Sequence, residues 1–307
     1  MKIKKHSYIL SKNGFILCVL ANIGNYYLGE ILYGLLPQKN TSIKYIDGKK
    51  FFKYWSIQNK NKKLKGKVGE PTKYDQYYKT VSAIYGSYSY DHTLIGKVFR
   101  VEKDEIEKIW IPVNFESLGV KQKPYIEKLS NFLSIDPENI DVAGSNMLDQ
   151  NILSNNDFDI VLNTKESSQR MVSMIRKLTS DPLYNEEIRP NNIHHRRFIL
   201  NSVKICSFGS SEDENIFEDS KYTLISQSKK KKARVIDDSE SLLSPSKYKI
   251  LVDNKESYFI SYHVGHTALF KKDDFIEFEA PLFDFKIKNK NVSAYVCPIE
   301  GTWVAIF

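Results

Sequence analysis

The pattern of hydrophobic and polar positions changes twice along the chain. Residues 1–118 hold short aromatic and β-branched runs separated by glycines, which predicts strands and loops. The turn-forming segment Ser11–Gly14 separates the runs Ser7–Leu10 and Phe15–Leu20 and predicts a hairpin. A signal sequence is the alternative, because basic residues precede the second apolar run, but the turn separates the two.

Two segments within residues 1–118 carry candidate contacts to nucleic acid. The lysine-rich segment 58–69 predicts a solvated loop, with phosphate contact as the alternative. Tyrosines crowd residues 74–90, a composition that is common on half-buried strands. Tyrosines also stack on bases. We favour packing over base stacking for this cluster.

Helical and strand patterns alternate between residues 119 and 225. Apolar residues at helical spacing predict helices over Lys121–Leu133 and after Thr164, a candidate N-cap. Short apolar runs predict strands over Ile140–Ala143, Asp157–Leu162, Arg196–Leu200 and Val203–Phe208, the last two forming a hairpin.

The last part of the chain begins with a polar and strongly basic stretch. Ser226–Arg234 predicts a linker or exposed loop, with contact to a nucleic-acid backbone as the alternative. Strand-like alternation returns after Arg234 and predicts a small β-domain or barrel. The patterns therefore divide the chain into an N-terminal β-rich region (1–118), a central part (119–225) and a C-terminal β-domain (226–307).

Composition and charge narrow the environment and the partners. The 45 Lys and Arg against 37 Asp and Glu give a net charge of +8, which favours anionic partners such as nucleic acid. The three cysteines form no disulfide framework or CxxC zinc pattern. No apolar run approaches the roughly 20 residues of a membrane helix. We therefore expect a cytoplasmic protein with no membrane contact.

The strongest candidate chemistry lies within Val142–Leu162. Gly144 and Ser145 follow a predicted strand, and the sequence Asp157-Phe158-Asp159 follows Ser145 after 11 intervening residues. Side chains alternate along a strand, so Asp157 and Asp159 are expected to share a face. Adjacent carboxylates repel unless a cation lies between them, and their hard oxygens suit Mg²⁺ or Mn²⁺. A Gly-Ser turn can bring backbone N–H groups and a hydroxyl to a phosphate.

This combination resembles the signature of the DNA polymerase beta-like nucleotidyltransferase superfamily, and the resemblance covers residues 120–210. It implies an α+β fold in which a central nucleotidyltransferase core, a mixed sheet with helices, is flanked by the two β-rich regions. It implies that Gly144 and Ser145 hold the phosphates of a nucleoside triphosphate. It also implies that Asp157 and Asp159 are the catalytic residues and bind two divalent ions, Mg²⁺ or Mn²⁺.

The implied reaction is template-independent transfer of a nucleoside monophosphate from an NTP or dNTP to a hydroxyl acceptor, with release of pyrophosphate. The acceptor is an RNA or DNA 3′ end, an oligonucleotide or a protein. A role in prokaryotic phage defence or as a toxin follows by analogy only. Arg196, Arg197 and Lys204 lie on or beside the predicted hairpin and are candidate phosphate ligands.

The sequence departs from the family pattern at one position. The family usually places a third carboxylate on the later hairpin strand, where Cys206 stands here. A thiol is a poor ligand for Mg²⁺. Either the strand is misaligned, another acid substitutes, or the protein is a catalytically degenerate nucleotide- or nucleic-acid-binding protein. The candidate substitutes are Asp237, Asp238 and Glu240, followed by Glu212, Asp213 and Glu214. A structural module with a coincidental motif is a further reading.

Overall fold

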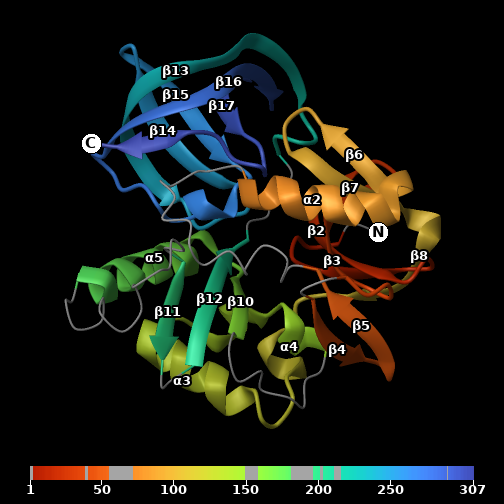
Figure 1. Cartoon of the computed structure of the whole chain (residues 1–307). Coiled ribbons are helices and arrows are strands. Elements are labelled where there is room, and N and C mark those ends of the chain that lie inside the picture. Colours follow the sequence, from red (N-terminus) through yellow and green to blue (C-terminus); the bar gives the residue numbers. More distant parts are fainter. Residues whose placement is uncertain are drawn as a thin grey trace.

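The computed structural model describes residues 3–38, 41–54, 72–148, 158–180, 196–200, 203–210, 216–288 and 290–307. Its strands form three sheets of eight, four and six strands (Figure 1). The described part of the chain is mostly β, with 51% strand and 22% helix. The predicted α+β fold around a polymerase-beta-like core of sheet and helices is therefore wrong. Period-two alternation in the two flanking regions produces the eight- and six-stranded sheets, which hold more strands than the helix-bearing middle part.

The first sheet is formed by the N-terminal region. Its strands are β1 (Tyr8–Ser11), β2 (Phe15–Ile23), β3 (Tyr26–Gly34), β4 (Ser42–Ile46), β5 (Lys49–Lys53), β6 (Ser89–His92), β7 (Gly96–Glu102) and β8 (Ile106–Trp110). Strands β1 and β2 form the predicted hairpin, in which the N–H of Gly14 donates to the carbonyl of Ser11 at 2.9 Å. Gly14 has a φ of +76°, which the turn requires and glycine adopts without strain.

Helix α2 (Thr72–Tyr85) replaces part of the strand-and-loop pattern predicted for this region. Tyr74, Tyr77, Val81 and Tyr85 recur every three to four residues, so one helical face enters the core beneath the sheet. The packing role predicted for the tyrosines is confirmed, but aromatic content led to the wrong element. The lysine-rich segment 58–69 lies outside the described residues.

The middle sheet is the smallest of the three and has the order β11-β12-β10-β9. Its strands are β9 (Ile140–Val142), β10 (Phe158–Leu162), β11 (Arg197–Leu200) and β12 (Val203–Gly209), and its helices are α3 (Lys123–Leu133), α4 (Ser145–Leu148) and α5 (Lys165–Ser180). The predicted hairpin is confirmed, with β11 antiparallel to β12. The predicted cap is also present, because Thr164 Oγ1 accepts a hydrogen bond from the N–H of Ser167 at 3.1 Å.

The third sheet curls into a barrel. Its strands are β13 (Lys221–Glu240), β14 (Ser246–Val252), β15 (Lys255–Ser261), β16 (Phe275–Ile287), β17 (Lys290–Cys297) and β18 (Val304–Ile306). Strand β13 pairs with both β14 and β16 and so closes the sheet on itself. The basic stretch predicted as a linker is part of β13. Lys230 and Lys232 stand opposite Glu279 and Glu277 of β16, and opposite charges across strands stabilise the pairing.

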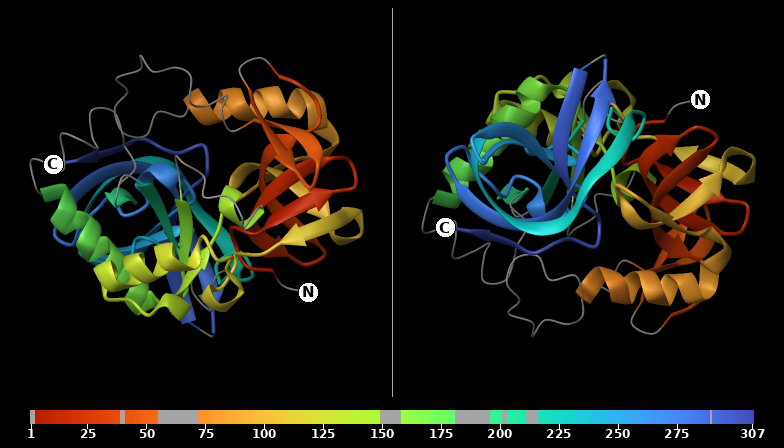
Figure 2. Two further views of the ribbon diagram at one scale, coloured as in Figure 1. Left: turned by 90° about the horizontal axis from the view of Figure 1, so that it is seen from below. Right: turned by 90° about the horizontal axis from the view of Figure 1, so that it is seen from above.

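The three sheets pack directly on one another. In both views of Figure 2 the N-terminal strands lie to one side of the other two sheets. In the described ranges, five single-turn 3₁₀ helices connect the strands and helices: η1 (Gly86–Tyr88), η2 (Lys103–Glu105), η3 (Phe115–Ser117), η4 (Pro137–Asn139) and η5 (Val264–His266). Across the described residues, every helix is too short or too polar to span a bilayer.

Candidate functional site

The predicted Gly-Ser turn lies directly against the second aspartate of the motif. The N–H of Ala143 donates to the carbonyl of Asp159 at 2.9 Å, which ties the turn to β10. Gly144 has a φ of +63°, and a Cβ at this position would lie 1.9 Å from Asp159 Oδ2 and 2.8 Å from its Cβ. Only glycine allows this approach, so the backbone of the turn packs on the carboxylate.

The Asp159 side chain lies on the face of the middle sheet opposite the helices. Its neighbours Phe158 and Ile160 are buried in the core that α3 and α5 cover, and strand alternation turns Asp159 the other way. Cys206 of β12 is the register partner of Asp159, and Arg197 of β11 is the partner of Cys206. Three predicted positions therefore form one cross-strand row.

The Cys206 thiol is 1% exposed and stands beside Asp159, where the family pattern places a carboxylate. No acid occurs in Val203–Gly209, so β12 offers no third hard oxygen ligand. Lys204 lies two residues before Cys206 on the same strand. Its side chain is therefore on the same face of the sheet as Cys206 and Asp159.

Arg196 is buried beside this row. Its guanidinium carbon lies 4.0 Å from the centre of the Phe208 ring, and the His6 ring lies 4.1 Å from the same ring. Burial, together with the positive charges of Arg196 and Lys5, lowers the pKa of His6 to about 3. His6 is therefore neutral at physiological pH, and Arg196 supplies the positive charge of this stack.

The N-terminal sheet contributes a polar row to the same region. Tyr8, Cys18 and Glu30 are cross-strand partners on β1, β2 and β3. Burial raises the pKa of Tyr8 well above its usual value, and the negative charges of Asp159 and Glu30 add to the effect. Tyr8 and Met147 of α4 belong to one hydrophobic cluster, with Cys18 packed against it, which places the row near the Gly144–Ser145 turn.

Glu30 is the unexpected acid in this row. Its Oε1 atom is buried and has no hydrogen-bond partner among the described residues. Burial raises the pKa of Glu30 to about 8, against the opposing effect of the Arg196 charge. Sequence reasoning missed Glu30, because no local motif surrounds it and only the packing of two sheets brings it here.

Helix α4 is held between the two sheets. Met147 of α4 packs in a cluster with Tyr8 and Tyr33 of the N-terminal sheet. Lys44 of β4 donates from Nζ to the carbonyl oxygen of Ser145 at 3.1 Å. The N-terminal region thus fixes the position of the turn that carries Gly144 and Ser145.

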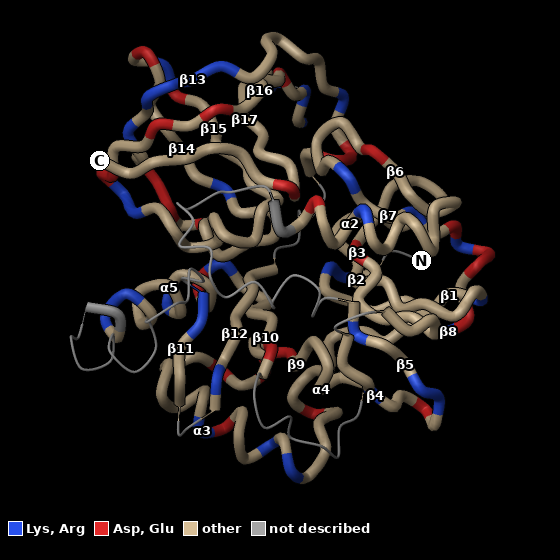
Figure 3. The backbone as a smooth tube through the Cα atoms, viewed as in Figure 1, with Lys and Arg blue, Asp and Glu red and all other residues tan. Residues whose placement is uncertain are grey.

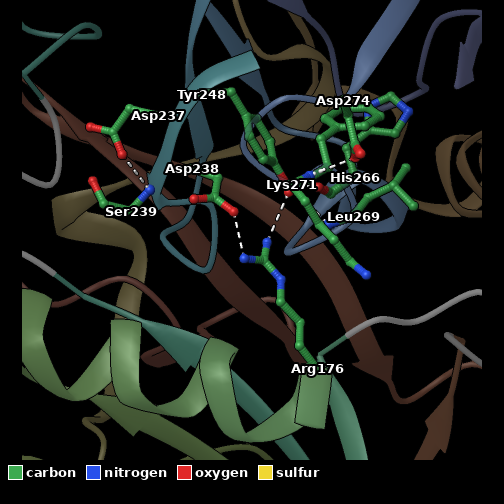
Figure 4. Close-up of polar contacts among 10 residues, drawn as sticks. Arg176, Asp237, Asp238, Ser239, Tyr248, His266, Leu269, Lys271 and Asp274 are labelled. Carbon is green, nitrogen blue, oxygen red and sulfur yellow. Dashed lines mark hydrogen bonds and ion pairs between the residues drawn. The ribbon is translucent and has the colours of Figure 1, made fainter. Parts of the chain in front are cut away.

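The substitute acids on β13 lie elsewhere. Asp238 Oδ2 is 2.5 Å from Nη1 of Arg176, which also donates from Nη2 to the carbonyl of Phe270 at 2.9 Å (Figure 4). Asp237 Oδ1 accepts from the N–H of Ser239 at 2.8 Å. Arg176 belongs to α5, which covers the face opposite Asp159. The structure therefore does not bring Asp237 or Asp238 to the Asp159 carboxylate.

Part of the predicted metal site lies beyond the described residues, including Asp157, Glu212, Asp213 and Glu214. Within the described ranges, no three His, Cys, Asp or Glu side chains gather as metal ligands. Asp159 is suited to be one ligand of a divalent ion, because its hard carboxylate oxygens lie against the backbone of Gly144.

Comparison with family models, curated proteins and solved structures gives no match for this chain.

Proposed function

We propose that this protein is a metal-dependent nucleotidyltransferase that transfers a nucleoside monophosphate from an NTP or dNTP to a hydroxyl acceptor. The observation that carries the proposal is the contact of the Gly144 backbone with the Asp159 carboxylate. A backbone without a side chain lets a phosphate approach closely, and a carboxylate at the same point holds the cation that accompanies a triphosphate.

The residues around this contact have separate roles in the proposal. Asp159, with Asp157, would hold Mg²⁺ or Mn²⁺. The bound ion supplies neutralisation of the triphosphate charge and a lower pKa for the acceptor hydroxyl. Arg197 and Lys204 share the Asp159 face and orient the phosphates by charge. Packing on Phe208 restrains the Arg196 guanidinium, which lowers the entropy cost of orienting an anion beside it.

A second function is favoured by Cys206. A buried thiol in register with Asp159 provides no hard ligand, which supports a catalytically degenerate protein that binds nucleotide or nucleic acid without turnover. The two functions differ in turnover, and both require nucleotide or nucleic acid to bind.

The test is incubation of the purified chain with each α-labelled NTP and dNTP, with Mg²⁺ or Mn²⁺, in the presence and absence of RNA. We expect label in polymer, small product or the protein itself, and its loss in Asp159→Asn. Asp284→Asn is the matched control, because Asp284 is a strand carboxylate of the barrel, where it accepts from Ser293.

The outcomes separate the two functions. Transfer that is lost in Asp159→Asn and kept in Asp284→Asn supports the transferase. Nucleotide-dependent thermal stabilisation without transfer supports the binding protein. Equal transfer by the wild type and Asp159→Asn would contradict the proposed site.

A further inference from the structure

One face of the C-terminal barrel combines exposed positive charge with aromatic rings, of which Phe275 and Phe307 are exposed and Trp303 is half-buried. Lys230, Lys232 and Arg234 of β13 are exposed. Ala233, which separates Lys232 from Arg234, and Val235, which follows Arg234, are buried in the barrel core. Alternation therefore turns the three basic side chains outward together. Figure 3 shows Lys and Arg recurring along β13 at the outer side of the barrel.

The aromatic rings lie across the strand pair next to these basic side chains. Lys230 Nζ is 4.5 Å from the centre of the Trp303 ring, and Lys232 Nζ is 5.5 Å from that of Phe307. Phe307 is 70% exposed and Phe275 is 58% exposed. The N–H of Phe307 donates to the carbonyl of Phe275 at 2.9 Å, which sets the two residues side by side.

This juxtaposition selects among anionic partners. Strand β16 lies between β13, which carries the basic side chains, and β18, which Trp303 and Phe307 flank. Its residues Glu277 and Glu279 lower the positive charge of the face. A ligand that is held by charge alone, such as an anionic lipid surface, would therefore gain little here. A single-stranded nucleic acid presents phosphates and unstacked bases together, so it can contact both the basic side chains and the aromatic rings.

We propose that this face of the barrel, formed by Lys230, Lys232, Arg234, Phe275, Trp303 and Phe307, binds single-stranded nucleic acid. The basic side chains contact the phosphate backbone, and the rings stack on successive bases. The inference does not rest on nucleotidyl transfer, because the face belongs to a different sheet from Asp159 and uses none of its residues.

The test measures fluorescence anisotropy of labelled oligo-U and oligo-dT with the full chain over a range of salt concentrations. Trp303→Ala should weaken binding by about tenfold or more, and Trp303→Phe should retain most of it, because a phenyl ring still stacks. Lys230→Ser/Lys232→Ser should weaken binding and reduce the slope of log affinity against log salt by about 1.4.

A matched control isolates the surface. Lys121→Ser/Lys128→Ser removes the same charge from exposed positions at and beside α3, on the opposite side of the molecule in Figure 1, and should leave the affinity within about twofold. If the wild type transfers no nucleotide but binds oligonucleotide, and the Trp303 and lysine variants weaken that binding, the catalytic proposal fails and this one holds.

Three results would overturn the inference. One is no binding of either oligonucleotide at low salt. Another is wild-type affinity in the variants of Trp303 and of the two lysines, with thermal unfolding unchanged. The third is equal affinity for duplex DNA or anionic vesicles that Trp303→Ala does not reduce, since that pattern indicates charge without stacking. A difference between oligo-U and oligo-dT identifies the preferred sugar within the proposal.

Discussion

At Gly144 the backbone touches a carboxylate, so adding a single methyl group tests the site. Gly24 is a second glycine with positive φ, at +53°, and a Cβ there would meet nothing within 4 Å. The two positions share the strain of a left-handed backbone and differ in their surroundings. Their comparison separates backbone strain from the contact with Asp159.

We expect Gly24→Ala to lower the free energy of unfolding by about 1 kcal/mol, the cost of left-handed strain. Gly144→Ala should cost about 3 kcal/mol or more and abolish nucleotide-dependent stabilisation. Rotation of the Asp159 side chain gives no relief, because its own Cβ would lie 2.8 Å from the new methyl group. Urea unfolding and thermal shifts with NTP measure both. Equal costs for the two variants would contradict the contact.

The residue contacts that sequence could predict are the local ones. Gly144 and Asp159 belong to segments that lie close together in sequence, and the resemblance of that motif to a family signature implied that they share one site. Glu30 and His6 come from segments more than a hundred residues away in sequence. His6 packs on Phe208 of the middle sheet, and Glu30 lies in the row of β1, β2 and β3 that faces the same region. Both positions depend on how two sheets pack, and no local pattern encodes that.

At the scale of elements, local pattern again decided what could be predicted. The hairpin of β1 and β2 and the elements from α3 to β12 carry clear turn or periodicity signals. Helix α2 was missed because its tyrosines favour strands by composition while their spacing favours a helix. Strand β13 was missed because four consecutive lysines imitate a solvated linker, and its pairing with β16 is long-range.

The cross-strand row on β1, β2 and β3 makes stability depend on pH through Glu30. Its pKa in the folded protein, about 8, lies above its ordinary value of 4.5 because of burial. The folded state thus binds the proton more tightly than the unfolded state does. The stabilisation is complete below pH 4.5 and is lost as the pH rises through about 8.

The glutamine of Glu30→Gln is neutral at every pH, so the variant does not lose stability as the pH rises. We expect the variant to match the wild type below pH 4.5 and to exceed its free energy of unfolding at pH 9 by roughly 5 kcal/mol. Urea unfolding across this pH range measures the difference. Glu107→Gln, on β8 of the same sheet, alters an exposed carboxylate and should leave the profile unchanged. A parallel shift at all pH values would exclude Glu30 titration as the cause.

At the scale of the whole molecule, the N-terminal segment ties the three sheets together. Lys4 pairs with Asp141 of β9 at 3.0 Å, and Lys5 pairs with Glu218, just before β13, at 3.0 Å. The N–H of Ile299 donates to the carbonyl of Ile95 at 2.8 Å and joins the barrel to the N-terminal sheet. The sheet that clamps α4 is therefore anchored at several points, and its docking is part of the site.

The Lys5–Glu218 pair gives the sharpest test of this anchoring, because its side chains are 2% and 0% exposed. Removal of one partner leaves a buried charge uncompensated, so Lys5→Met should cost about 3–5 kcal/mol of unfolding free energy. Lys5→Met/Glu218→Leu should recover much of that loss. In contrast, Lys49→Met breaks the exposed pair with Glu107 at 3.2 Å and should cost under about 1 kcal/mol.

Urea unfolding of the four chains completes this comparison, and nucleotide-dependent thermal shifts show whether the site follows. Because the N-terminal sheet holds α4, Lys5→Met should also weaken nucleotide binding, and the double variant should restore it. A double variant no more stable than Lys5→Met would mean that the two charges do not compensate each other. Loss of stability without loss of nucleotide binding would mean that the Lys5–Glu218 pair does not support the Gly144–Asp159 site.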